Sequence, residues 1–478
     1  MSAHTNGPVQ QLHAGRVLLP EGWVHDVRLT LDERGMILDV ERGVDPGAAI
    51  RLAGPVIPGM VNVHSHAFQR LIAGFTDIAE RPDDSFWTWR EAMYRAVRAL
   101  DADRFEAACR HVYVEMLRAG YTTVGEFHYV HHQPDGTPYD QPAELAERVL
   151  ASADETGIGV SLLPVLYSHS GFGGQPPCAG QARFINDVDA LLGLHSEIER
   201  AIRDRPLADS GVAFHSLRAV TPEQIETVTA KLDPATPIHI HVAEQQREVD
   251  DCLAWSGARP IQWLLDHAPV DQRWCLVHAT HADAAELEAL ARREPVVGLC
   301  PVTEANLGDG LFDAERFAGL GGAMAIGSDS HVSLDPVEEL RWLEYGQRLR
   351  ARQRNRLGNA RQPAVAEALY AGAADAGARA LGQPVGRIAT GRRADLIVLD
   401  GSDPLLEGCP DHHLLNRWLF GVGQRAVRDV FVAGQKVVAD GHHPREDESA
   451  RAFAQVCRDL LYREVGQPLP VEQTLSRT

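Results

Sequence analysis

The sequence predicts an α/β protein: a (β/α)8 TIM-type barrel joined to a small β-sandwich-like domain built from both ends of the chain. Two observations predict this fold. Short apolar runs alternate with amphipathic helical stretches through the middle of the chain, as they do in repeated β-α units. Strand-like segments without intervening helices fill the N-terminal region and return late in the sequence. A chain of 478 residues is long enough for both parts.

The N-terminal segment, residues 1–55, has the pattern of short strands. Residues 27–31 alternate apolar and polar side chains, residues 32–35 supply a turn, and residues 36–40 resume the strand pattern, which indicates a hairpin. A similar pattern returns at residues 394–399 and 427–438. We therefore expect residues 1–55 and 385–445 to form one composite β domain, followed by a polar C-terminal extension over residues 446–478.

The barrel is expected over residues 56–384. Helical patterns, for example at 104–118 and 223–232, separate its candidate strands. Eight such strands are predicted, at residues 56–63, 122–127, 159–166, 212–217, 238–242, 274–277, 296–300 and 323–327. Active sites of barrels of this type gather at the C-terminal ends of the strands.

Composition and charge exclude several classes of protein. The chain has 46 Lys and Arg against 66 Asp and Glu, a net charge of −20, which predicts a surface that repels nucleic acid and anionic membranes. Its seven cysteines are scattered without a Cys-x-x-Cys pair, which favours free thiols in a reducing compartment. We therefore expect a cytoplasmic protein that binds neither nucleic acid nor a membrane.

Metal-ligand residue types stand at three of the predicted strand ends. His64 and His66 follow the first strand, and alternation along extended backbone places both on one side. His241 ends the fifth strand, and Asp329 follows the eighth. Taken singly, these could be a chance histidine pair, a core histidine and a helix N-cap. Together they predict an N/O donor set suited to Zn²⁺, with one coordination position open to water.

Other polar residues at strand ends suit proton transfer and anion binding. Glu244 lies three residues after His241, and His278 ends the sixth strand, so a carboxylate and an imidazole are available for general acid-base work. The alternative for Glu244 is a first-turn glutamate that interacts with the helix dipole. Arg90 and Arg218 offer cationic forks for a carboxylate substrate, although a single arginine is more commonly a surface residue.

These motifs together resemble the amidohydrolase superfamily. They are Val-Ile-Pro-Gly-Met-Val-Asn-Val-His-Ser-His over 56–66, His-Val-Ala-Glu over 241–244, His278 and Gly-Ser-Asp over 327–329, and the segment 386–399 extends the resemblance to the flanking domain. The fourth strand has no lysine to bridge two metals, so the sequence is similar to the mononuclear deaminase branch. This resemblance implies one Zn²⁺ per chain, held by His64, His66, His241 and Asp329, in a homodimer.

A more specific resemblance, to the formimidoylglutamate deiminases of bacterial histidine degradation, comes from residues 64–70, 126–129 and 300–308. It implies hydrolytic deamination of N-formimidoyl-L-glutamate, a dicarboxylate, to N-formyl-L-glutamate and ammonia. Asp329 with His278 would deprotonate water, and Glu244 would carry protons to the substrate nitrogens. The resemblance further assigns the substrate carboxylates to Gln69, Arg90, Tyr129 and Arg218, and places His215 close to the reacting group.

Two alternatives remain open at this point. One is a nucleobase or nucleoside deaminase of the same superfamily, acting on guanine or a modified adenosine. The other is a metal-binding barrel without catalytic activity, against which the presence of both Glu244 and His278 argues.

Overall fold

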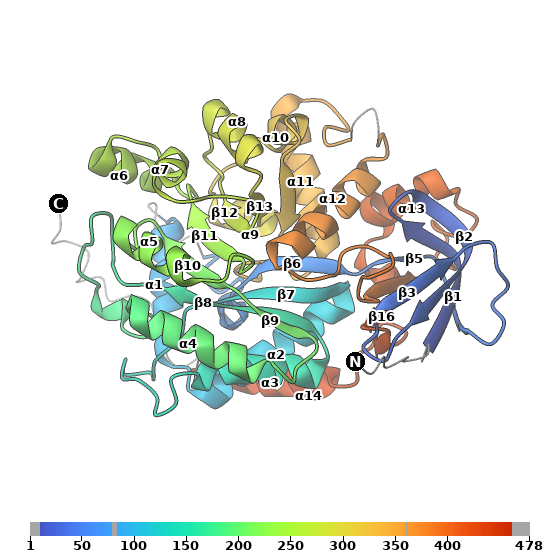
Figure 1. The fold of residues 1–478 in the computed structure, drawn as a ribbon, viewed down its shortest axis with the longest axis horizontal. Helices are drawn as coiled ribbons and strands as arrows, with labels where there is room; N and C mark the ends of the chain where they lie inside the picture. The colour runs from blue at the N-terminus through green and yellow to red at the C-terminus, as the bar shows by residue number, and fades with distance from the viewer. Residues whose placement is uncertain (1–9, 79–83, 359–361, 461–478) are drawn as a thin grey trace, which may run out of the picture.

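The computed structural model describes residues 10–78, 84–358 and 362–460, and it confirms the predicted fold class. Parallel strands form a barrel that closes through pairing of β14 with β6 and of β10 with β8 (Figure 1). A short extra strand, β9 (Ala208–Ser210), pairs with β8. The barrel strands are β6 (Met60–Ser65), β7 (Tyr121–His128), β8 (Gly159–Leu166), β10 (Val212–Ser216), β11 (Ile238–Val242), β12 (Trp274–His278), β13 (Val296–Leu299) and β14 (Ala323–Ile326).

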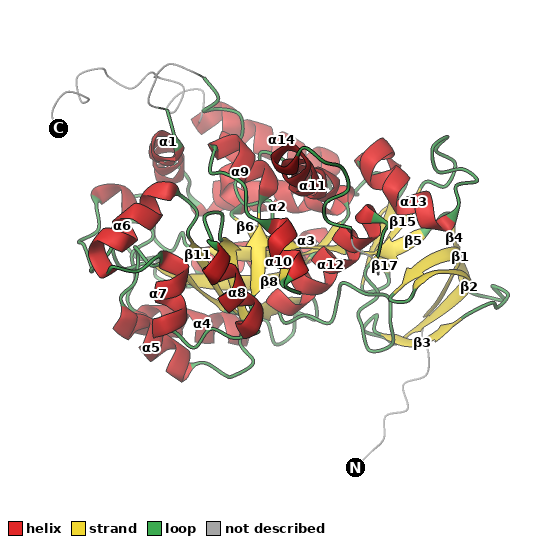
Figure 2. Cartoon of the chain, turned by 90° about the horizontal axis from the view of Figure 1, so that it is seen from above, coloured by secondary structure: helices red, strands yellow, loops and turns green. Residues whose placement is uncertain are grey.

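Helices surround the barrel, so that its strands are enclosed when seen from above (Figure 2). The helix α2 is bounded as its sequence suggests, because Asp101 accepts a hydrogen bond from the Arg104 amide at its start and Gly120 adopts φ 102° at its end. The helices between the barrel strands are α1 (Phe86–Arg98), α2 (Ala102–Ala119), α3 (Glu144–Thr156), α4 (Val188–Ala201), α5 (Pro222–Lys231), α6 (Gln246–Ser256), α7 (Pro260–His267), α8 (Ala284–Arg293), α9 (Pro301–Leu307) and α10 (Ala314–Gly319), and α11 (Pro336–Ala351) and α12 (Val365–Ala380) follow β14.

Strands from both ends of the chain form a second sheet, in the order β17-β16-β15-β5-β1-β2-β3, with β4 beside β1. The N-terminal strands and the late strands lie side by side at the right of Figure 1. Leu12 and Val27 share one apolar core with Leu396 and Phe431, so neither end completes this domain alone. The strands are β1 (Gln10–Leu19), β2 (Gly22–Leu31), β3 (Ile37–Glu41), β4 (Ile50–Leu52), β5 (Val56–Pro58), β15 (Leu396–Leu399), β16 (Val427–Val432) and β17 (Gln435–Val438).

The predicted first barrel strand, residues 56–63, is in fact divided between the two sheets. Strand β5 pairs with β1 and β15, and β6 begins two residues later in the barrel. The division falls at Gly59, where an added Cβ would lie 2.3 Å from the Thr122 hydroxyl oxygen. Only glycine allows this close approach, so the β domain runs directly into the strand that ends at His64 and Ser65.

The chain after β17 returns to the barrel. Helix α14 (Glu446–Val456) packs on α2, where the centre of the Phe453 ring lies 4.6 Å from the centre of the His111 ring. Earlier in the chain, helix α13 (Asp411–Arg417) lies between β15 and β16. The remainder of the predicted extension, residues 461–478, lies outside the described residues.

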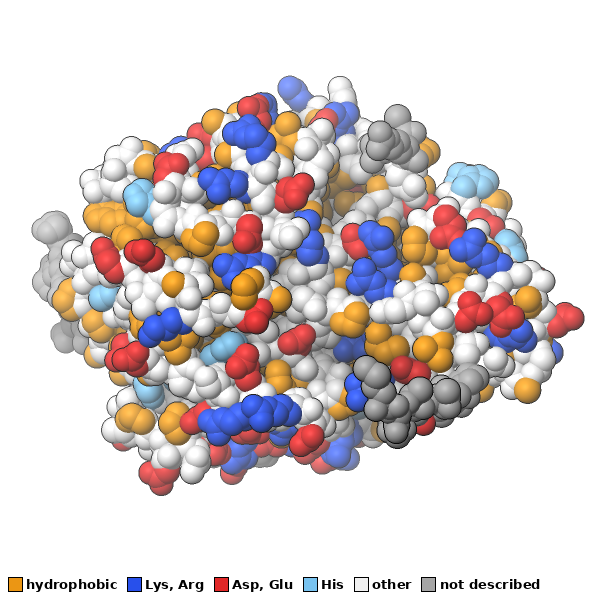
Figure 3. All heavy atoms as spheres, viewed as in Figure 1, with side chains coloured by type: hydrophobic (Ala, Val, Ile, Leu, Met, Phe, Trp, Pro, Cys, Tyr) orange, Lys and Arg blue, Asp and Glu red, His pale blue; other side chains and the backbone are white. Residues whose placement is uncertain are grey.

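The described surface mixes both signs of charge. On the face in Figure 3, acidic and basic side chains are interspersed. Among the described helices, none combines the length and the apolar composition needed to cross a bilayer.

Candidate active site

A cavity opens at the C-terminal ends of the barrel strands. Every site residue that the sequence predicts, except His64, lines it, and His64 lies behind them, in ring contact with His66 and His241. The predicted residues in the wall are His66, Gln69, Arg90, Tyr129, His215, Arg218, His241, Glu244, His278 and Asp329.

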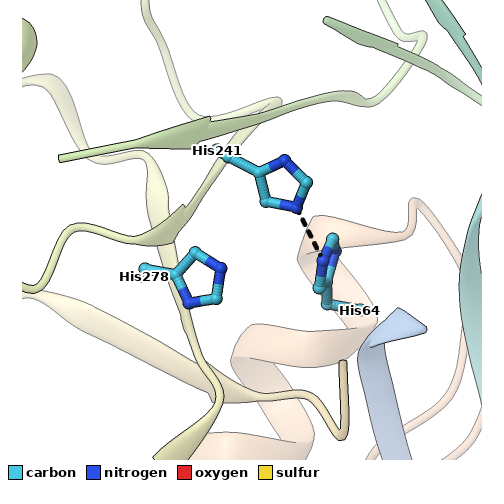
Figure 4. Close-up of side chains that lie close together, drawn as sticks. All are labelled: His64, His241 and His278. Atoms are coloured by element: carbon cyan, nitrogen blue, oxygen red, sulfur yellow. Dashed lines mark hydrogen bonds between the residues drawn. The ribbon is translucent and has the colours of Figure 1, made fainter. Parts of the chain in front are cut away.

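The four predicted metal ligands converge. The Nε2 atoms of His64 and His241 are 2.9 Å apart, and Asp329 Oδ1 lies 3.4 Å from His64 Nε2 and 3.3 Å from His66 Nε2. Figure 4 shows the imidazoles of His64 and His241 pointing toward one another, with His278 beside them. Possible ligand atoms of His64, His66 and Asp329 all lie within 4.8 Å of one another.

The hydrogen bonds behind these donors orient them for a metal. His66 Nδ1 lies 3.1 Å from the Phe127 carbonyl oxygen, and His241 Nδ1 lies 2.8 Å from the His215 carbonyl oxygen. Donation from both Nδ1 atoms leaves each Nε2 lone pair free to coordinate a cation. Two imidazole nitrogens in contact beside a carboxylate are the donor chemistry of a Zn²⁺ site, so these residues fit a divalent ion.

The backbone at the end of β14 brings Asp329 to this position. An added Cβ at Gly327 would lie 2.7 Å from the His64 Cβ, so only glycine lets the two strands approach this closely. Asp329 adopts φ 46°, and its amide donates to the His64 carbonyl at 3.0 Å. His278 also has a left-handed backbone, with φ 67°. Such strained residues persist where the surrounding structure fixes them, as it commonly does in functional sites.

Three acidic side chains surround the buried His278 imidazole. Its Nε2 lies 4.0 Å from Glu244 Oε1 and 3.9 Å from Asp329 Oδ2, and its Nδ1 lies 3.3 Å from Glu304 Oε1. Burial by itself lowers the pKa of His278, but the carboxylates of Glu244, Glu304 and Asp329 outweigh burial and raise it. Burial raises the pKa of Glu244. The Glu244 carboxyl group, which can hold a proton, therefore lies beside the His278 imidazole, which can also hold one.

Two arginines bring positive charge to the cavity without an ion-pair partner among the described residues. Arg218 is buried and Arg90 is half-buried, and neither forms an ion pair or a hydrogen bond with another described residue. Burial, followed by the charge of Arg218, lowers the pKa of His215, which keeps that imidazole neutral. Buried charge without a partner is costly in a folded protein. The arrangement therefore suits an anionic ligand that supplies the missing carboxylates.

Gln69 and Tyr129 form a neutral polar pair in the wall. Gln69 Nε2 donates to the Tyr129 hydroxyl at 2.8 Å, while Gln69 Oε1 is buried and has no partner among the described residues. The pair therefore retains hydrogen-bonding capacity for a ligand.

The sequence did not identify the apolar walls of this cavity. Phe86, Trp89, Met93 and Tyr94 share one face of α1 with Arg90, and Tyr167, Phe184 and Leu307 complete the lining. The spacing along α1, with side chains at i, i+3, i+4, i+7 and i+8, is a signal that could have found that face. Tyr167 and Phe184 come from segments after β8, and nothing in their local pattern marks them.

Imidazoles and buried carboxylates at the strand ends of the barrel meet Arg90 from α1 and Arg218 from the segment after β10 in one cavity, an arrangement typical of metal-dependent hydrolases. Residues 56–437 match the amidohydrolase family, so the chain belongs to that family, whose members generally bind a divalent metal. Residues 9–54 match the N-terminal domain described as "Formimidoylglutamate deiminase HutF". The resemblance found in the sequence is thereby confirmed.

Individual relatives agree with this assignment. The chain is 57% identical to a formimidoylglutamate deiminase of Pseudomonas aeruginosa, over 94% of this chain and 99% of that protein. It is 30% identical to a 5-methylthioadenosine/S-adenosylhomocysteine deaminase of Natronomonas pharaonis, over 90% and 92%. Among solved structures, an amidohydrolase from Brucella melitensis superposes with a TM-score of 0.90 at 46% identity, over 95% of this chain and all of that one.

Proposed function

We propose that this chain hydrolyses N-formimidoyl-L-glutamate to N-formyl-L-glutamate and ammonia, a step of histidine degradation, with one bound Zn²⁺. The observation that carries the proposal is that Arg90 and Arg218, which form no ion pair with any residue the structure describes, lie in the same cavity as the metal-donor set. The amidohydrolase assignment and the Pseudomonas aeruginosa relative support it.

His64, His66, His241 and Asp329 would hold the metal. When bound, a divalent ion of this kind polarises its ligands and lowers the pKa of water toward ~7. The hydrogen bonds from His66 and His241 to backbone carbonyls keep the Nε2 atoms directed at the ion.

The substrate carboxylates would be held by Arg90, Arg218, Gln69 and Tyr129. A guanidinium can bind a carboxylate through two parallel hydrogen bonds, which fixes both its position and its orientation. His215 lies between this group and the metal donors, since its ring is 5.8 Å from the Tyr129 ring and 5.2 Å from the His241 ring. Fixing both ends of a flexible substrate places its formimidoyl carbon beside the donor set.

Three side chains would carry the protons. Asp329, assisted by the His278 imidazole 3.9 Å from its Oδ2, would accept a proton from the attacking water as the water oxygen bonds to the formimidoyl carbon. Glu244, whose pKa burial raises, delivers a proton to the terminal nitrogen. The hydroxyl group of the adduct then gives its proton to the same nitrogen by way of the Glu244 carboxylate, so that the carbon–nitrogen bond breaks, ammonia leaves and the oxygen remains on carbon as the formyl group. The proton taken up by Asp329 passes to Glu244, which restores the starting protonation state.

A deaminase of guanine or of a modified adenosine is the second candidate. The aromatic side chains Trp89, Tyr94, Tyr167 and Phe184 favour it, since they offer surfaces on which a purine could stack. Two unpaired arginines argue against it, because a neutral base leaves them without anions.

Ammonia release separates these functions directly. The zinc-loaded enzyme is assayed with N-formimidoyl-L-glutamate, guanine and 5-methylthioadenosine. We expect turnover of N-formimidoyl-L-glutamate, and turnover of a purine alone would overturn the proposal.

Metal content by plasma mass spectrometry is expected near one zinc per chain. A content below about half an equivalent, in protein purified without chelator, would contradict the metal site and favour a barrel without catalysis.

We also propose that the protein is a cytoplasmic homodimer. The described cysteines form no disulfide, as expected of a reducing compartment. Sedimentation velocity and cell fractionation test these two points. A monomer at micromolar concentration would contradict the homodimer. Recovery of the protein from a membrane fraction would contradict the cytoplasmic location.

A further inference from the structure

One indole contacts three guanidinium groups at the mouth of the cavity. The Arg90 Cζ lies 4.5 Å from the centre of the Trp87 ring, the Arg247 Cζ lies 4.7 Å from it, and the Arg218 Cζ lies 5.6 Å from it. Trp87 and Arg90 belong to α1, whereas Arg218 follows β10 and Arg247 is in the first turn of α6. Trp87 is therefore the shared neighbour of both arginines that line the cavity.

Nearby carboxylates stabilise the charge of Arg218 without forming an ion pair with it. Glu244 and Glu248 act on Arg218 only through space, and Glu248 accepts the backbone amides of Ala243 and Glu244 at 3.1 and 3.2 Å. The third cation differs, because Arg247 has a partner at the surface in Asp251, 3.6 Å away. Among the described residues, the guanidiniums of Arg90 and Arg218 form no ion pair, and each lies over an aromatic ring.

An aromatic ring can stabilise a cation without neutralising its charge. The negative face of an indole attracts a guanidinium, and the attraction is stronger where water is excluded. A carboxylate in the same place would hold the arginines more strongly, but it would also compete with any carboxylate that enters the cavity. An uncharged partner keeps two like charges close together while leaving both available to a ligand.

We propose that Trp87 is a positioning residue that holds Arg90 and Arg218 ready for a substrate's carboxylates. The inference rests on the proposed function, because it concerns how that site recognises a dicarboxylate. Arg247 contacts the same indole from α6 and supports it from the outer side. A shift of the ring would misalign both binding groups at once.

Steady-state kinetics of Trp87 variants tests this role. We expect Trp87→Leu to raise the KM for N-formimidoyl-L-glutamate at least about tenfold while kcat stays within about threefold, because the metal donors are untouched. Trp87→Phe, which keeps an aromatic face, should recover most of the loss. Trp87→Glu should raise KM further than Trp87→Leu, since its carboxylate would pair with the arginines.

The matched control is Trp342→Leu, at a tryptophan on α11 that is 41% exposed. Zinc content and thermal melting confirm that each variant is folded. A KM for Trp87→Leu within twofold of wild type would overturn the inference, and so would equal losses in Trp87→Leu and Trp87→Phe, which would indicate packing alone.

Calorimetric titration with glutarate separates this inference from the proposed function. If the wild-type enzyme fails to deiminate N-formimidoyl-L-glutamate, the proposed function fails. Weaker glutarate binding to Trp87→Leu than to wild type and to Trp342→Leu would still support the role of Trp87. Equal glutarate binding by all three proteins would contradict it.

Discussion

The two walls of the cavity are built in opposite ways. On the metal side, His66 and His241 are on or directly after barrel strands, and a backbone carbonyl faces the Nδ1 atom of each. On the other side, Arg90 is on the inserted helix α1, and both it and Arg218 lack polar partners among the described residues. Under the proposed function, this difference means that the barrel fixes the reactive groups, whereas substrate recognition depends on charges left free for a ligand. Changes on the first wall should lower kcat, and changes on the second should raise KM.

The largest effect is expected from Asp329→Asn. An amide is a weaker metal ligand than a carboxylate, so zinc content should fall well below one equivalent and kcat should fall about 10³-fold or more. Plasma mass spectrometry and the ammonia assay measure the two effects. Asp266→Asn, at an exposed helix position, is the control. Full zinc content with activity near wild type would contradict the assignment of Asp329 as a ligand.

Glu244→Gln should lower kcat by about 10²–10⁴-fold, because an amide cannot transfer a proton, while zinc content stays near one equivalent. A lower kcat with unchanged zinc content would show that Glu244 takes part in the reaction and does not hold the metal. The exposed Glu288 on α8, changed to Gln, provides the comparison. A kcat within a few-fold of wild type would remove Glu244 from the proton pathway.

Arg218→Met tests the opposite wall. Loss of a charge-assisted hydrogen-bonded pair should raise KM for N-formimidoyl-L-glutamate about 10–100-fold with little change in kcat or zinc content. Arg316→Met, at an exposed arginine, is the matched control. An unchanged KM would mean that Arg218 does not bind a substrate carboxylate, and the contrast between the walls would no longer hold.

The smallest effect is expected from Glu304→Gln. The side chain would still accept the hydrogen bond from His278 Nδ1, but the loss of its charge should lower kcat by about three- to tenfold without changing KM. Glu304→Asp, which keeps the charge on a shorter chain, distinguishes orientation from charge. Identical kinetics in both variants and in wild type would show that His278 is positioned without Glu304.

The sequence predicted the fold class and the wall made by strand ends, because both depend on local pattern. Buried apolar runs located the barrel strands, and His64, His241 and Asp329 stand directly at or after their ends. It did not predict the division at Gly59, since residues 56–63 read as one apolar run and the break depends on a contact with Thr122. The contact of Glu304 with His278 was missed for a similar reason, because it depends on packing between the ends of neighbouring strands.

The composite β domain has a consequence for synthesis of the chain on the ribosome. The N-terminal strands of this sheet end with β5 at Pro58, but β15, which pairs with β5, begins only at Leu396. At about 5–20 residues per second, translation takes tens of seconds to cover that interval. Throughout it, the apolar face containing Leu12 and Val27 lacks the side chains that later cover it. A chain stopped at residue 390 is therefore expected to have protease-sensitive N-terminal strands, which limited proteolysis of the nascent chain would detect.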